Sequence, residues 1–150
     1  MKIKIDFTTN SSSSSFVVID ETGELEIPKF FESLVSGADL GETEFGWGPD
    51  EIRDSGSRIN FAYLQTLYGK GNPAWLPMLE KVIKETTGVK EIIWKLTDSY
   101  DTPEGEEWGY IDHQSCASEG KNTEIFESED VLKCFLFGKG SYIVLDNDNH

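Results

Sequence analysis

Apolar and polar residues alternate at the start of the chain, and this pattern predicts a β-strand. Ile3, Ile5 and Phe7 are each separated by one polar residue, which is the period of a strand with one buried face. The next apolar segment, residues 16–19, is an unbroken run rich in β-branched side chains. Such a run predicts a strand that is covered on both faces.

A short helix and a long loop are predicted next. Pro28 suits the first turn of a helix, Gly37 would end it, and its apolar side would be formed by Phe30, Phe31, Leu34 and Val35. Residues 38–57 contain several glycines and no regular period. We expect them to form a long loop. Such a loop either has a function or forms an irregular cover over the core.

Two longer helices are predicted in the middle of the chain. Ser57 is expected to cap the first, whose apolar side carries Ile59, Ala62, Tyr63 and Leu67. Asn72 caps the second, Pro73 takes its first position and Gly88 follows its end. Its apolar side is formed by Trp75, Leu76, Leu79, Val82 and Ile83.

The remaining elements complete a prediction of the fold class. Residues 89–97 predict a strand with Ile92, Trp94 and Leu96 on one face, and residues 108–114 predict a strand that could pair with it. Ser128 caps a last helix, and residues 141–146 form a last strand. We therefore expect one α+β domain over residues 1–150, with a mixed sheet of about four or five strands and about three or four helices packed mainly on one face.

The charge of the chain limits its partners. It has 28 acidic and 13 basic residues and a formal net charge of −15. This charge repels nucleic acids and anionic membranes, and it favours a basic protein partner, a cation or simple solubility. Two cysteines are too few for a disulfide framework, and the chain has neither a signal-peptide pattern nor an apolar run long enough to span a membrane. We expect a cytoplasmic protein.

Acidic residues are concentrated between residues 98 and 130, which hold eleven of them against Lys121 alone. The usual explanation is a solvated face. The alternative is a surface for a basic, nucleic-acid-binding partner, on which carboxylates occupy the place of phosphates. Glu104, Glu106, Glu107 and Trp108 are the candidate contacts, with Trp108 either an anchor or part of the core.

Five consecutive serines follow Asn10 and lie between the first two predicted strands. Hydroxyl and N–H groups in a tight loop can bind an anion or a nucleotide, so the candidate residues are Asn10, Ser11, Ser12, Ser13, Ser14 and Ser15. A phosphate loop would also have glycines and a lysine, which are missing. A modification or recognition segment and a solvated loop are the alternatives.

A divalent metal is the one cofactor that the sequence suggests, as an alternative to having none. Asp112 and His113 lie at a predicted strand end, and Asp146, Asp148 and His150 lie near the C-terminus. They would form one site only if the last strand lay beside the 108–114 strand. A strand-edge histidine and a frayed polar terminus are the alternatives. No nucleotide fingerprint or nucleophile elbow is present, so we favour a protein that is not an enzyme.

Three segments carry a resemblance to known proteins: MKIKIDFTTNSSSSSFVV, GYIDHQS and LKCFLFGKGSYIVLDNDNH. They resemble a group of uncharacterised proteins of Firmicute bacteria and their phages, which share the signature Phe-x-(Ser/Thr)-Asn-Ser-Ser-Ser-Ser-Ser-Phe. The resemblance implies a bacterial or phage protein in the host cytoplasm and assigns no catalytic residue. Together with the charge, it leads us to expect an acidic interaction protein that inhibits a basic host protein.

Overall fold

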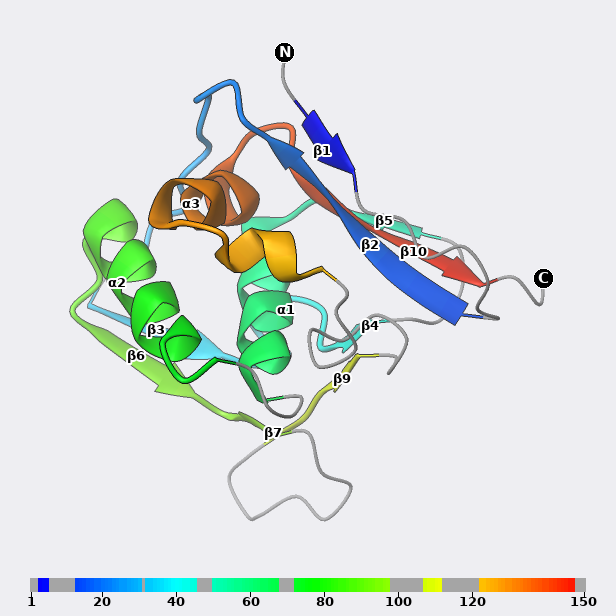
Figure 1. The fold of residues 1–150 in the computed structure, drawn as a ribbon. Coiled ribbons are helices and arrows are strands. Elements are labelled where there is room, and N and C mark those ends of the chain that lie inside the picture. The colour runs from blue at the N-terminus through cyan, green and yellow to red at the C-terminus, as the bar shows by residue number, and fades with distance from the viewer. Residues whose placement is uncertain are drawn as a thin grey trace.

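The chain folds as a single α+β domain, which confirms the predicted fold class (Figure 1). The computed structural model describes residues 3–5, 13–30, 32–45, 50–67, 72–97, 107–111 and 122–147. The strands of these described ranges are divided among four small sheets, of which one has four strands and three have two. In the part of the chain that is described, no helix has the length and apolar character needed to cross a membrane.

The largest sheet is antiparallel and has the strand order β1-β2-β10-β5. Its strands are β1 (Ile3–Ile5), β2 (Ser13–Asp20), β5 (Asp50–Ile52) and β10 (Tyr142–Asn147). Strand β2 pairs with β10 in a register that places Val17 opposite Ile143. Val17, Val18 and Ile19 are all buried, which confirms a strand covered on both faces.

Part of the serine run belongs to strand β2 and is not a loop. Ser13, Ser14 and Ser15 pair with Asn147, Asp146 and Leu145 of β10. Strand β10 continues past the apolar residues of β2 and supplies backbone partners to these serines, so their low strand propensity is overridden. The predicted loop is therefore wrong for residues 13–15, and Asn10, Ser11 and Ser12 lie outside the described residues.

Three parallel strand pairs form the second β region. The pairs are β3 (Ser33–Ser36) with β6 (Glu91–Trp94), β7 (Leu96–Thr97) with β8 (Glu107–Trp108), and β4 (Glu44–Phe45) with β9 (Tyr110–Ile111). Strands β6 and β7 follow each other directly, as do β8 and β9. Within the described residues, the predicted pairing between the 89–97 strand and the 108–114 strand is confirmed where Thr97 lies opposite Trp108, whereas Tyr110 and Ile111 pair with β4 instead.

The helix predicted from Pro28 is wrong, because residues 33–36 form strand β3. Leu34 and Ser36 are buried, whereas Ser33 and Val35 face outward, which is the alternation of a strand. Strand β6 supplies backbone partners along its whole length. A short apolar run cannot be assigned to helix or strand by its period alone, and here the distant β6 decides the outcome.

Helix α1 (Ser55–Leu67) is central and almost entirely buried. It begins two residues before the predicted cap, because Asp54 rather than Ser57 caps it. The Asp54 carboxylate accepts hydrogen bonds from the Ser57 N–H at 2.8 Å and from the Ser57 hydroxyl at 2.7 Å. A carboxylate at this position accepts from an N–H of the first turn that has no partner within the helix. Its negative charge also interacts favourably with the positive end of the helix dipole.

The other two α-helices follow their predicted signals more closely. Helix α2 (Trp75–Thr87) ends at the predicted Gly88, which adopts the left-handed conformation at φ 78°. Its predicted start is wrong, because the helix begins at Trp75 and follows Ala74; Asn72 accepts from the Ala74 N–H in the turn before the helix and does not cap it. Helix α3 (Glu129–Phe137) follows a short 3-10 helix (Thr123–Phe126), and its cap is the predicted Ser128, whose hydroxyl accepts from the Val131 N–H at 3.1 Å.

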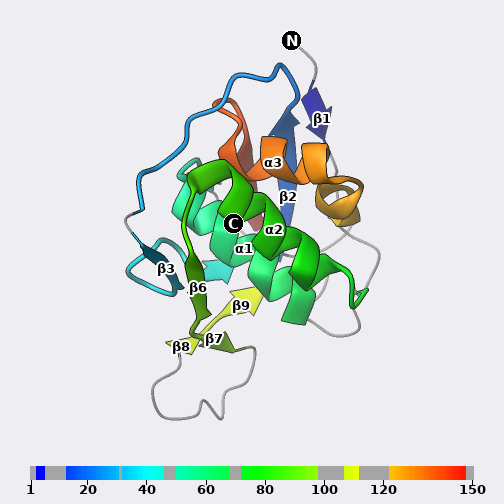
Figure 2. The same cartoon turned by 90° about the vertical axis from the view of Figure 1, so that its left-hand side faces the viewer.

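The hydrophobic core surrounds helix α1, and its largest buried side chains include Phe45, Phe61, Phe135 and Phe137. Helix α1 contacts strands β3, β7 and β9 of the parallel pairs, whereas α3 contacts β2 of the antiparallel sheet. Figure 2 shows α1 and α2 side by side, with the connection from β2 to β3 running down one side of the molecule. A packing of all helices on one face of one sheet is therefore not confirmed.

Candidate functional site

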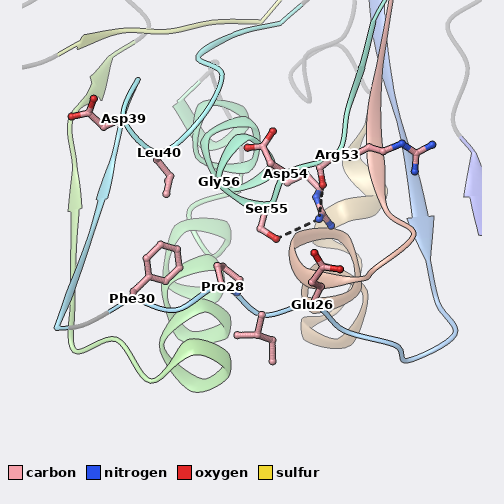
Figure 3. A pocket seen from close by; sticks show the side chains of 11 residues that line it. Glu26, Pro28, Phe30, Asp39, Leu40, Arg53, Asp54, Ser55 and Gly56 are labelled. Carbon is pink, nitrogen blue, oxygen red and sulfur yellow. Dashed lines mark hydrogen bonds between the residues drawn. The ribbon is translucent and has the colours of Figure 1, made fainter.

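A cleft of about 580 Å³ opens at the N-terminal end of helix α1 (Figure 3). We call it the α1 cleft. Three segments form its walls: a strap of residues 26–30, a turn at residues 39–40, and residues 53–58. The lining residues are Glu26, Ile27, Pro28, Phe30, Asp39, Leu40, Arg53, Asp54, Ser55, Gly56 and Arg58.

The strap and the turn are held in place by hydrogen bonds to other parts of the fold. The Glu26 N–H donates to the Phe137 carbonyl at 2.7 Å, which ties the strap to the end of helix α3. Asn60 is fully buried, and its amide donates to the carbonyls of Gly37 and Glu42 at 3.0 and 2.9 Å. The walls of the cleft are therefore fixed by contacts made elsewhere in the fold.

Gly56 brings helix α1 close to the turn. A Cβ added at Gly56 would overlap the backbone carbonyl of Leu40. Because the obstacle is backbone, a side chain at this position would push the turn away from the helix. The absence of a side chain at residue 56 therefore sets how closely the two walls approach.

The strap and the turn give the cleft an apolar surface. Ile27 is 45% exposed and is one of the few large apolar side chains in the described residues that remain open to solvent. Pro28, Phe30 and Leu40 are partly buried beside it. An exposed apolar surface within a hollow is a common feature of binding sites.

Two carboxylates on the cleft have no hydrogen-bond or ion-pair partner within the described part of the chain. Glu26 and Asp39 are both exposed, and Figure 3 shows them on opposite sides of the cleft, with the Asp39 carboxylate pointing outward from its rim. Asp54 differs from them because its carboxylate is engaged with Ser57. Glu26 and Asp39 are therefore available to a ligand.

The cations of the cleft already have partners. The Arg53 guanidinium lies 3.0 Å from the Glu51 carboxylate and 4.1 Å from the centre of the Tyr142 ring. Its side chain points away from the cleft in Figure 3. The partners of Arg53 lie outside the cleft, so its positive charge does not offset the two free carboxylates there.

Arg58 is 3% exposed and holds together three parts of the chain. Its Nη1 donates to the carbonyls of Phe135 at 2.7 Å and Gly138 at 3.0 Å, and its Nη2 donates to the Arg53 carbonyl at 3.0 Å. Burial lowers the pKa of Arg58 to about 10, although the nearby Asp54 and Glu26 oppose this shift. Arg58 thus carries its charge at neutral pH.

The candidate partner-binding residues of the acidic segment are only partly described. Glu107 accepts a hydrogen bond from the Ala38 N–H at 3.0 Å, so its carboxylate supports the turn next to the α1 cleft. Trp108 is half-buried and stacks on Tyr110 with ring centres 5.7 Å apart. Glu104 and Glu106 lie outside the described residues.

The serine run and the C-terminal segment meet in the antiparallel sheet. Ser14 pairs with Asp146, the one candidate metal ligand with a described backbone. Asp112, His113, Asp148 and His150 lie outside the described residues. Strand β10 pairs with β2 and β5, whereas β9 pairs with β4. Among the residues that can be searched, no group of three or more His, Cys, Asp or Glu side chains is arranged to hold a metal.

Comparison with known proteins assigns no function to the α1 cleft, so the cleft is interpreted from its own geometry. No protein-family model, curated protein or solved structure gives a significant match to this chain.

Sequence reasoning did not find the α1 cleft. Its walls come from segments that are far apart in the chain and were expected to be helix and loop. The available signal was the order of residues 54–57, Asp-Ser-Gly-Ser, which is typical of a capped helix start. It would have placed the first turn of α1, but not the strap that faces it.

Proposed function

We propose that this chain is a non-enzymatic, acidic interaction protein, and that the α1 cleft binds a segment of a basic protein partner. The observation that carries the proposal is the composition of the cleft. Its apolar surface lies beside two carboxylates without partners, Glu26 and Asp39, while the guanidinium of Arg53 is engaged outside it. Lysine and arginine side chains on an apolar segment complement such a surface.

The size of the cleft supports a ligand of modest dimensions. Its volume of about 580 Å³ lies within the range of roughly 300 to 1,000 Å³ that is common for binding pockets. The hydrogen bonds of Asn60 and of the Glu26 N–H fix its walls without a ligand. A site with fixed walls loses little conformational entropy on binding.

The net charge of the chain supports the choice of a basic partner. A charge of −15 attracts basic proteins over long distances and increases their rate of association. A basic nucleic-acid-binding protein of a bacterial host is the partner class that we propose. The chain would inhibit it in the host cytoplasm by occupying its basic surface.

The proposal can be tested with an array of short peptides that combine basic, apolar and serine residues in random order. The array is probed with the whole chain, with a Glu26→Gln/Asp39→Asn variant, and with a Glu85→Gln/Glu91→Gln variant. The last pair changes the net charge equally, and both of its residues are exposed and lie outside the cleft. It is therefore a matched control.

We expect the whole chain and the control to bind peptides that are both basic and apolar. The cleft variant should bind them about fivefold to tenfold more weakly, because each exposed ion pair contributes roughly 0.2–1 kcal/mol. Binding should also weaken between about 0.05 M and 0.5 M salt. The proposal fails if no basic peptide binds more tightly than a neutral one, or if the two variants behave alike.

A further inference from the structure

One buried donor of Arg58 is left without an acceptor. The Nε atom is buried and has no hydrogen-bond partner among the described residues, although both Nη atoms of the same guanidinium are bonded. An unsatisfied donor on a buried cation is costly, and native structures seldom retain one without a reason. Arg58 lines the α1 cleft, so a ligand in the cleft is a natural source of the missing acceptor.

The planar geometry of the guanidinium gives the direction of this donor. Nη1 donates to Phe135 and Gly138, which do not line the cleft. Nη2 donates to Arg53 and, in a long bond of 3.4 Å, to the Ser55 hydroxyl, and both residues do line it. The Nε–H lies on the same edge of the plane as Nη2, and this edge is the fork that binds a carboxylate through two parallel bonds. The free donor is thus on the same edge as Nη2, whose acceptors belong to two residues that line the cleft.

The first turn of helix α1 adds further donors at the same place. The Ser57 N–H is bound by the Asp54 carboxylate and the Arg58 N–H by the Asp54 carbonyl. The N–H groups of Ser55 and Gly56 are the other two donors of this turn, and both residues line the cleft. A helix N-terminus favours an anion, through these donors and through its dipole.

The charge around the site selects the kind of anion. Glu26, Asp39 and the net charge of −15 repel a free anion such as phosphate. A carboxylate at the end of a basic peptide is different, because the positive residues that precede it are attracted by the same charges. The apolar surface at Ile27 and Leu40 would receive its last side chain.

We propose that the α1 cleft binds the C-terminal end of the basic partner, with the terminal carboxylate held by the Arg58 Nε–H and the first turn of helix α1. This inference rests on the proposed function and specifies which part of the partner enters the cleft. The capture of a C-terminal carboxylate by backbone donors is a recurrent mode of peptide recognition.

The test compares two forms of one basic, apolar peptide chosen from the array: a free carboxylate and a carboxamide at the C-terminus. Fluorescence anisotropy of an N-terminal label gives both affinities for the whole chain. We expect the carboxamide to bind at least about tenfold more weakly, since it lacks the charge that Arg58 recognises. Equal affinities would overturn this inference and leave the proposed function standing, whereas no binding of either form would overturn both.

A second measurement follows Arg58 directly and needs no variant of this buried residue. The chain has only two arginines, Arg53 and Arg58, so the NMR spectrum of arginine Nε–H groups contains two signals, and an Arg53→Lys variant assigns them. The carboxylate peptide should shift the Arg58 signal and the carboxamide should not. An Arg58 signal that stays unchanged when the carboxylate peptide binds contradicts the inference. A shift on addition of inorganic phosphate alone would indicate a general anion site and would also overturn it.

Discussion

The polar residues of helix α1 and those on the rim of the α1 cleft use their hydrogen-bonding groups differently. Asn60 is fully buried, and each polar group of its amide has a partner. The side chains of Glu26 and Asp39 are exposed and make no hydrogen bond or ion pair within the described residues. Buried polar groups must be satisfied if the fold is to be stable, whereas exposed ones need not be. The first set therefore serves the fold, and the second is free to serve recognition.

Arg58 belongs to both sets. Its two Nη atoms bind carbonyls that hold the structure together, while its Nε–H has no acceptor in the described part of the chain. This difference between the buried polar residues and the exposed residues of the cleft rim predicts how far each substitution lowers the free energy of unfolding. Variants that remove interior contacts should be costly, and variants of the rim should cost almost nothing.

The largest effect is expected for Asn60→Leu. Leucine is similar in size, but it removes the amide that accepts from the Ser36 hydroxyl and the buried Gly37 N–H and donates to the Glu42 carbonyl. Each unsatisfied group costs roughly 1–3 kcal/mol, so the free energy of unfolding should fall by about 3–5 kcal/mol. Urea denaturation measures this, and a loss below about 1 kcal/mol would show that the amide is not a main support of the turn.

Gly56→Ala should have the next largest effect. The new Cβ overlaps the Leu40 carbonyl, and overpacking of this kind costs about 1–3 kcal/mol. Peptide binding should weaken as well, because the wall of the cleft is displaced. Gly23→Ala is the control, since Gly23 has φ +92° and no atom within 4 Å of an added Cβ. The control should lose only about 1 kcal/mol and keep its binding.

Asp20→Asn tests an interior carboxylate and depends on pH. The hydrogen bond from the Thr22 N–H lowers the pKa of Asp20 below its ordinary value of 3.8, burial opposes this, and the bond from the Gly140 N–H adds to the lowering. Because the folded-state pKa is the lower one, the stabilisation is present above the unfolded-state pKa and is lost as the pH falls through the folded value. The variant should be about 1 kcal/mol less stable than the wild type at pH 7.

At about pH 2.5 the difference between this variant and the wild type should be smaller, because the wild-type carboxylate begins to be protonated. Urea denaturation at the two pH values gives both differences. A difference that stays the same at low pH would mean that the charge of Asp20 does not contribute to stability.

The smallest effect on stability is expected for the rim. Glu26→Gln/Asp39→Asn should change the free energy of unfolding by no more than about 0.5 kcal/mol, as is usual for surface changes without partners. The same variant should bind peptides about fivefold to tenfold more weakly. A large loss of stability would mean that the two carboxylates have a structural role, and the contrast between interior and rim would disappear.

Local signals in the sequence were sufficient for some elements of the fold. Ser128 caps the start of α3 with its own hydroxyl, and Gly88 ends α2 through its left-handed backbone conformation. The β-branched apolar run at residues 16–19 favours a strand by its composition alone. These features depend on a few neighbouring residues. Sequence reasoning could therefore place them correctly.

Other elements depend on distant partners and were predicted wrongly or not at all. Strand β3 exists because β6 lies beside it, and the last three serines extend β2 because β10 continues past its apolar part. The α1 cleft requires Asn60, the end of α3 and the strap to meet. No hydrophobic period or motif within one segment predicts that these distant segments come into contact. The cleft could therefore be found only from the three-dimensional structure.

The central claim is that a basic peptide binds in the α1 cleft. The most direct measurement is a titration of the ¹⁵N-labelled chain with the tightest peptide of the array, followed through its backbone N–H signals. The account predicts that the largest shifts occur in the three segments lining the cleft, residues 26–30, 39–40 and 53–58. Shifts concentrated on helices α2 and α3 or in residues 98–106, with those three segments unchanged, would contradict it.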